Sequence, residues 1–179
     1  MPVKIDELLH LYQEDSELQA FGGLLKQSSS GKFQIKGIAG SQTAFLIAAA
    51  YRLTQRNIVV LVNDKEEALY VHNDLKTLMP KKEIFLFPAS YKRPYQIEEV
   101  DNANVLQRAE VLNELNRTKS GRQIIITFAE ALNEKVINKR SLIKNTLEIQ
   151  QGVDLGMDFV TELLDEFGFE VEEYVYEPG

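Results

Sequence analysis

The residues best suited to chemistry form a short glycine loop between an apolar run over residues 33–38 and a very apolar run from residue 44. Glycines at this place are typical of a phosphate-binding loop. In that motif a second glycine allows close backbone approach, a lysine reaches the β- and γ-phosphates, and a hydroxyl holds Mg²⁺. The loop here comprises Gly37, Gly40, Ser41, Gln42, Thr43 and Ala44, and its last three residues replace the glycine, the lysine and the hydroxyl. The sequence therefore predicts a degenerate phosphate loop.

The backbone amides of such a loop remain even when its side chains have changed. Amides at a helix N-terminus attract anions, and we expect Ser41 to cap the helix that follows. Phosphoryl transfer also needs a lysine and a metal, but Lys36 precedes the loop, and no Asp-Glu pair follows the apolar run 124–127. We expect a loop kept for packing, without cofactor, metal or catalytic residue. Weak anion or nucleotide binding is the alternative.

The composition of the chain excludes several classes of functional site. The chain has no Cys and two His, which excludes Cys-ligated zinc and Cys nucleophiles and argues against a His-rich metal site. The net charge of the chain is −7, and all of the excess negative charge lies in residues 145–179, which hold ten acids and no Lys or Arg. Such a segment indicates a solvated face, or a surface for a basic partner. The longest apolar run, 44–51, is too short to cross a bilayer, so we expect a soluble cytoplasmic protein without a membrane partner.

Apolar periodicity predicts an α/β fold. Strand-like runs alternate with helical ones, and their continuous apolar character is typical of parallel strands buried on both faces. We expect helices on both faces of the sheet. Gly22-Gly23 predicts a break or a loosened turn between two N-terminal helices. The predicted strands are 33–38, 57–62, 83–87 and 123–127, and the predicted helices are 3–27, from 44, 64–79 and 101–117, the last with Val105, Leu106, Ala109, Leu112 and Leu115 inward.

The pattern changes after residue 127. Residues 129–136 favour a short helix, and 146–150 and 169–176 favour half-exposed strands. A helix opening at Gly156 or Asp158 should close at Gly168. We expect three parts: an N-terminal helical segment over 1–30, the α/β domain over 31–127, and a second, truncated small α+β domain over 128–179.

Two further features carry weaker signals. The loop Tyr91–Tyr95 mixes basic and aromatic residues as single-stranded nucleic-acid sites do, but five residues favour an ordinary structural loop. His72 lies on a charged helix, where we expect it to be exposed and without a catalytic role.

The ordered set of segments resembles the N-terminal UvrB-homology module of bacterial transcription-repair coupling factor (Mfd). The resemblance begins at Gly37–Ser41 and covers most of the chain beyond about residue 30. The segments that carry it after the loop are Val59–Asp64, Leu86–Pro88, Pro94-Tyr95, the helix around Arg108, Ile124–Thr127, Leu163–Phe169 and Tyr176–Gly179.

This resemblance implies a RecA/P-loop-like domain, similar to UvrB domain 1a, that has lost its nucleotide site. It implies a non-catalytic scaffold that recruits the damage-recognition ATPase UvrA in transcription-coupled nucleotide excision repair. ATP, Mg, DNA and RNA polymerase would then bind other domains of a full-length, helicase-like translocase. A regulatory α/β domain that binds a ligand or anion, unrelated to repair, is the alternative.

The resemblance places the UvrA contact in the second domain. The candidate partner-binding residues are Phe169, Glu170, Tyr174 and Tyr176. Relatives often carry a basic residue where this chain has Glu170, and the family continues past Gly179 into an Arg-Gly-containing strand that helps bind UvrA. We therefore expect this contact to need residues beyond Gly179.

Overall fold

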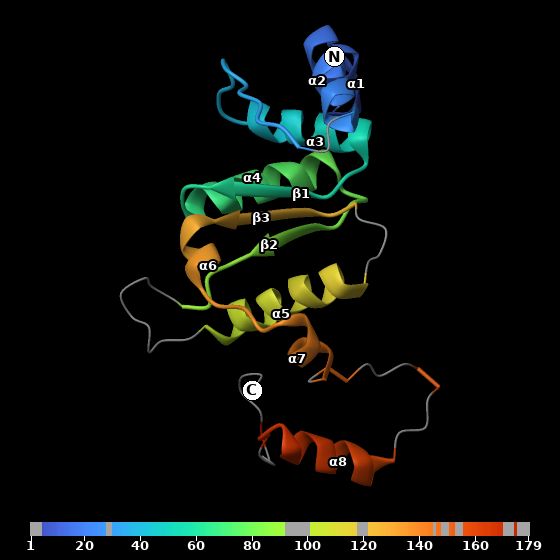
Figure 1. The fold of residues 1–179 in the computed structure, drawn as a ribbon, viewed down its shortest axis with the longest axis vertical. Coiled ribbons are helices and arrows are strands. Elements are labelled where there is room, and N and C mark those ends of the chain that lie inside the picture. Colours follow the sequence, from blue (N-terminus) through green and yellow to red (C-terminus); the bar gives the residue numbers. More distant parts are fainter. Residues whose placement is uncertain are drawn as a thin grey trace.

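The fold is built on a three-stranded parallel sheet (Figure 1). This computed structural model describes residues 5–27, 30–91, 101–117, 122–144, 146–147, 151–152, 156–169 and 174. The strands β1 (Ile58–Val62), β2 (Ile84–Phe87) and β3 (Ile124–Phe128) lie in the order β1-β3-β2, with Ile124 in register with both Ile58 and Ile84. Each strand is rich in β-branched or aromatic residues, which suits a pleated, buried surface.

Two helices connect the strands. The chain steps from β1 past β3 to β2 through α4 (Lys65–Leu78), then back to β3 through α5 (Asn102–Arg117). Because the steps run in opposite directions, right-handed crossovers place the two helices on opposite faces of the sheet. Asp64 caps α4 at the start of the predicted helix 64–79, accepting from the Glu67 N–H at 2.8 Å. The predicted α/β class, with a parallel sheet flanked by helices, is confirmed.

Three N-terminal helices pack against one another beside the β1 edge (Figure 1). These are α1 (Ile5–Glu14), α2 (Ser16–Gln27) and α3 (Gln42–Thr54). The predicted break at Gly22-Gly23 is wrong: the chain breaks at Asp15, whose Oδ1 accepts from the Glu17 and Leu18 amides. Gly22 lies inside α2, where a Cβ would stand 3.0 Å from Leu53 Cδ1. The glycine therefore allows close approach of α2 and α3.

Two strand predictions are corrected by the structure. Residues 33–38 form no strand, and both Phe33 and Ile35 are exposed. Residues 58–62 are a strand, but not one buried on both faces: Val59 is 63% and Leu61 57% exposed. An edge position alone is not the reason, because β2 is also an edge strand among the described strands and all its residues are buried. Helix α5 packs on β2, at the opposite edge of the sheet, and the alternating exposure along β1 shows that one of its faces is left open.

The chain after β3 is helical where it is described. It contains α6 (Ala129–Asn133), α7 (Lys139–Lys144) and α8 (Met157–Glu166). Helix α8 ends as predicted at Gly168, which has φ +81°. The Gly168 N–H donates to the Asp165 carbonyl, and the Phe169 N–H donates to the Leu164 carbonyl. These are the two hydrogen bonds of a Schellman motif. Residues 146 and 147 are not in a strand, and most of the other predicted strand positions, 148–150, 170–173, 175 and 176, lie outside the described residues.

Candidate functional site

The glycine loop turns sharply into α3. Gly37 (φ +82°) and Gly40 (φ +54°) adopt the left-handed backbone that glycine tolerates best. Helix α3 then begins at Gln42. The predicted Ser41 cap is wrong, because Ser41 has helical dihedrals and its side chain makes no capping hydrogen bond. The turn of a phosphate loop is thus present without the strand expected before it.

The polar groups of this loop bond one another. The Gln42 side chain folds back, so that its Oε1 accepts from the Ala39 N–H at 3.0 Å. The Gln42, Thr43 and Ala44 amides donate to the carbonyls of Ala39, Gly40 and Ser41 at 3.2, 3.3 and 3.0 Å. A phosphate loop needs such amides free to point at its ligand. Gln42, at the position of the missing glycine, therefore supplies an internal acceptor where a ligand oxygen would bind.

The same loop leads into a packed helix. Ala44 and Ala48 are buried in the core, whereas Ser41 and Gln42 are exposed and Thr43 is partly buried. Position 43 is Thr, so the lysine that a phosphate loop carries there is missing. Within the described part of the chain there is no group of three or more His, Cys, Asp or Glu side chains suited to a metal ion.

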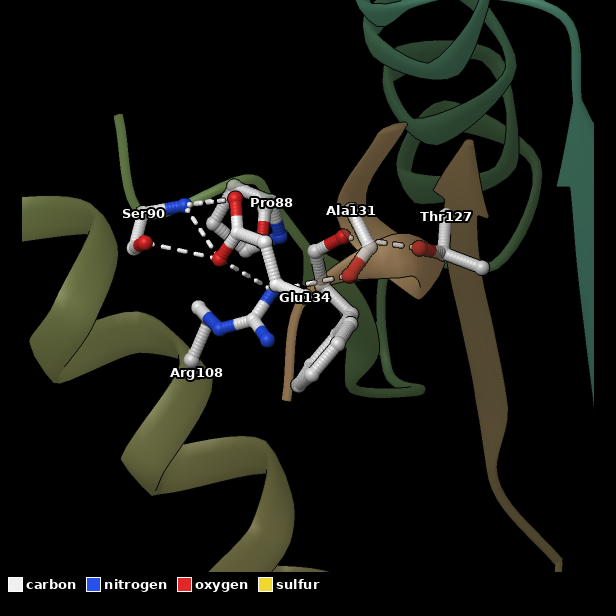
Figure 2. A network of polar contacts seen from close by, with 7 residues as sticks. Pro88, Ser90, Arg108, Thr127, Ala131 and Glu134 are labelled. Carbon is white, nitrogen blue, oxygen red and sulfur yellow. Dashed lines mark hydrogen bonds and ion pairs between the residues drawn. The ribbon is translucent and has the colours of Figure 1, made fainter. Parts of the chain in front are cut away.

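Several polar groups bond one another at the carboxyl end of the sheet, where α/β proteins commonly bind ligands. Thr127, at the end of β3, is 1% exposed, and its hydroxyl donates to the Phe87 carbonyl at 2.9 Å. An Arg108–Glu134 ion pair lies beyond it (Figure 2). Glu134 also lines a cavity of about 450 Å³, whose lining includes Asp64, Pro88 and Phe128. This end of the sheet is thus joined by polar contacts of the chain itself.

Arg108 is the polar residue that the periodicity analysis missed. Its side chain is 8% exposed and its Nη1 donates to the carbonyls of Pro88 and Ala131 at 2.6 and 3.1 Å. Nη1 lies 3.4 Å from Glu134 Oε2, and the guanidinium carbon lies 4.2 Å from the Phe87 ring centroid. Burial lowers the pKa of Arg108, and the Glu134 carboxylate opposes that shift.

Glu134 is held from its other side by Ser90. The Ser90 amide donates to Oε1 at 2.9 Å, and its hydroxyl donates to Oε2 at 2.7 Å. Together Arg108 and Glu134 join α5, the end of β2 and the segment after α6 (Figure 2). This arrangement suits a structural clamp, because Arg108 Nη1 and the Glu134 carboxylate bind groups of the chain itself, whereas Arg108 Nη2 is buried without a hydrogen-bond partner among the described residues.

The inward face predicted for α5 is therefore wrong in part. Arg108 and Val111 are the buried residues of the helix, whereas Val105, Leu106 and Leu115 are exposed. Arg108 lies one helical turn from Val111 and Leu112, so a charged residue on the apolar side of α5 was the available signal.

The remaining candidates do not meet at one place with the glycine loop. Phe169 and Tyr174 are exposed, whereas Glu170 and Tyr176 lie outside the described residues, as does most of the Tyr91–Tyr95 loop. His72 is partly buried rather than exposed: its Nε2 lies 3.0 Å from the Ile84 carbonyl, and burial lowers its pKa. No helix in the described ranges has both the length and the apolar character needed to cross a bilayer.

Comparison with known proteins gives three relatives of one name. The chain is 27% identical to the transcription-repair-coupling factor of Rickettsia bellii over 72% of its length, 23% to that of Borreliella burgdorferi over 97%, and 25% to that of Bacillus subtilis over 81%. It spans only 11%, 15% and 12% of these proteins. No family model and no solved structure matches. The chain is accordingly related to a region of the transcription-repair-coupling factors.

Proposed function

We propose that the chain is a non-catalytic module of a transcription-repair-coupling factor and serves as a scaffold for recruiting UvrA. The observation that carries the non-catalytic part is the self-bonded glycine loop, in which Gln42 Oε1 takes the Ala39 N–H. Gln42, Thr43 and Ala44 replace the glycine, lysine and hydroxyl that phosphoryl transfer would use. ATP hydrolysis, DNA and RNA polymerase then belong to other parts of the full-length protein.

The recruiting surface in this proposal lies in the C-terminal part. Phe169 and Tyr174 are exposed aromatic residues, a type that is enriched at protein–protein interfaces. They follow α8, which carries four of the ten acids that lie after residue 144. The UvrA contact is inferred from the resemblance, and these side chains supply apolar anchors for it.

Two measurements test the proposal. Melting of the chain with ATP and Mg²⁺ should give no stabilisation, whereas a rise of several degrees at millimolar nucleotide would contradict a nucleotide-free scaffold. Purified UvrA should be captured by the chain extended past Gly179. Capture should fall at least tenfold for Phe169→Ala/Tyr174→Ala and be unchanged for Leu11→Ala, an exposed apolar residue at the other end of the chain. Equal capture by both variants would remove these aromatic residues from the interface, and no capture at all would refute UvrA recruitment.

A second candidate, a ligand-binding regulatory domain, is favoured by one cavity. A space of about 890 Å³ lies between α1, α2 and residues 32–38, with Leu11, Phe21, Leu24, Phe33 and Ile35 in its lining. This size and apolar lining suit a small molecule. A single defined ligand that stabilises the chain and loses its effect in Phe33→Ala would favour this function over the scaffold.

A further inference from the structure

Residues 32–36 form a segment without regular secondary structure between α2 and the glycine loop. None of the described residues exchanges a hydrogen bond with the backbone of this segment, so its N–H and C=O groups are unpaired. All five residues are exposed, and none has a positive φ. Figure 1 shows the segment as a drawn-out stretch of chain beside α3. Its backbone therefore resembles an edge strand that has no neighbour.

The segment lines the cavity of about 890 Å³ that it shares with α1 and α2. The Phe33 ring meets the Phe21 ring edge to face, with the centroids 5.7 Å apart, and this contact holds the segment against α2. Both the helices and the segment expose large apolar side chains to the cavity, namely Leu11, Leu24, Phe33 and Ile35. The cavity thus combines apolar helix surface with a length of unpaired backbone.

We propose that this cavity binds an extended peptide of a partner protein, which pairs its backbone with residues 32–36 as an added strand. A small apolar molecule in the same place would cover the N–H and C=O groups of the segment without bonding them, and burying such groups unpaired costs free energy. A peptide backbone bonds these groups instead, while its alternate side chains enter the apolar part of the cavity. Five residues of strand extend about 16 Å, so a heptapeptide covers the whole segment.

The charges of the segment favour an acidic peptide. Residues directly opposite each other in paired strands stand on the same face of the pair. Peptide residues opposite Phe33 and Ile35 therefore add to the apolar lining. The peptide residues between and beside them share the other face with Lys32 and Lys36. A peptide in which apolar and acidic residues alternate matches both faces.

The remaining charges of the cavity agree with this partner. The acids of its lining, Asp15 and Glu17, lie on the helical side, and Asp15 Oδ1 already accepts from the amides of Glu17 and Leu18. A second copy of the chain fits less well, because pairing residues 32–36 with themselves sets lysine opposite lysine. Figure 1 shows α1 and α2 at the end of the molecule away from α8, so this contact goes beyond the UvrA surface that we propose and does not depend on it.

Fluorescence anisotropy with labelled, capped heptapeptides tests the strand pairing. A peptide of alternating valine and glutamate should bind saturably, and at least tenfold more tightly than one of alternating valine and lysine or one with the same valines and glutamates in two blocks. N-methylation of every valine or of every glutamate removes the N–H groups from one edge of the strand. One of these two methylated peptides should therefore bind at least tenfold more weakly than the parent. Absence of saturable binding, or equal binding of the parent and both methylated peptides, would overturn the proposal.

Variants of the chain test whether the peptide binds in this cavity. Leu24→Asn should weaken binding of the valine–glutamate peptide at least tenfold, whereas Leu132→Asn in α6 should not, although these leucines are 50% and 53% exposed. Lys32→Glu/Lys36→Glu should reverse the preference in favour of the valine–lysine peptide. Lys81→Glu/Lys135→Glu, with the same change of charge at exposed lysines elsewhere, should leave the preference unchanged. Equal effects of the two leucine variants, or an unchanged preference in Lys32→Glu/Lys36→Glu, would overturn the site.

Discussion

Replacement of Arg108 by Met tests how far the buried ion pair holds the sheet to the segment after it. Met fills much of the volume of the Arg stem but donates no hydrogen bond. The change removes the bonds to the Pro88 and Ala131 carbonyls at 2.6 and 3.1 Å. It also leaves Glu134, whose side chain is only 14% exposed, without its counter-charge.

These contacts set bounds on the free energy of unfolding that Arg108→Met should lose. Hydrogen bonds to a charged group contribute about 1.5–3 kcal/mol each, and breaking one partner of a buried ion pair costs about 3–5 kcal/mol. Glu134 keeps its bonds to Ser90, so its desolvation stays partly compensated. We therefore expect Arg108→Met to lower the free energy of unfolding by about 3 kcal/mol, near the lower end of that range.

Urea unfolding followed by circular dichroism measures this loss. Glu134→Met should cost less, because the guanidinium keeps two carbonyl acceptors. The double variant should lose about 0.5–3 kcal/mol less than the sum of the two single losses, because residues in contact couple by this amount and each single change already removes their interaction. A loss below 1 kcal/mol for Arg108→Met, or strict additivity in the cycle, would refute the clamp that we infer.

Three further predictions follow from individual contacts. Gly22→Val should destabilise the chain by about 1–3 kcal/mol through overpacking against Leu53, whereas Gly23→Ala, where an added Cβ meets nothing within 4 Å, should stabilise it by about 0.5–1 kcal/mol; equal effects in thermal melts would disprove the close approach. The pKa of His72 is lowered in the folded state, so the neutral form of its side chain favours folding. The free energy of unfolding should therefore be highest above pH 6.5, the ordinary pKa of histidine, and should decline as the pH falls below it. In urea titrations, His72→Gln should flatten that decline. Thr43→Lys alone should yield no ATP hydrolysis in a phosphate-release assay, because no acid pair follows β3 to organise Mg²⁺; measurable turnover would count against the non-catalytic proposal.

The sequence was informative where one signal determines one structure. The β-branched runs at residues 58–62 and 124–128 could only be strands, and Asp64 and Gly168 marked helix ends because capping chemistry is local. It was misleading where the outcome depends on a distant partner. Gly22 reads as a helix breaker until Leu53 lies against it, and residues 33–38 alternate like a strand without joining the sheet.

The candidate site follows the same division. The replacement of the glycine, lysine and hydroxyl of a phosphate loop by Gln42, Thr43 and Ala44 is visible from residue types alone. The sequence does not reveal the hydrogen bond between Gln42 and the Ala39 amide, because this bond depends on the rotamer of the Gln42 side chain within the folded loop. The role of Arg108 was hidden for another reason: a buried charge is revealed only by the carbonyls and the carboxylate that surround it, and these come from three separate segments.

The internal acceptor of the glycine loop also has a thermodynamic consequence. A protein that binds a nucleotide in its folded state gains stability from the concentration of that nucleotide, so its folded population follows the energy state of the cell. If the loop binds no nucleotide, as we propose, its turn would hold at any nucleotide concentration, because Gln42 already accepts from the Ala39 amide. A module built this way would hold the same shape, and the same stability, in a starved cell as in a growing one.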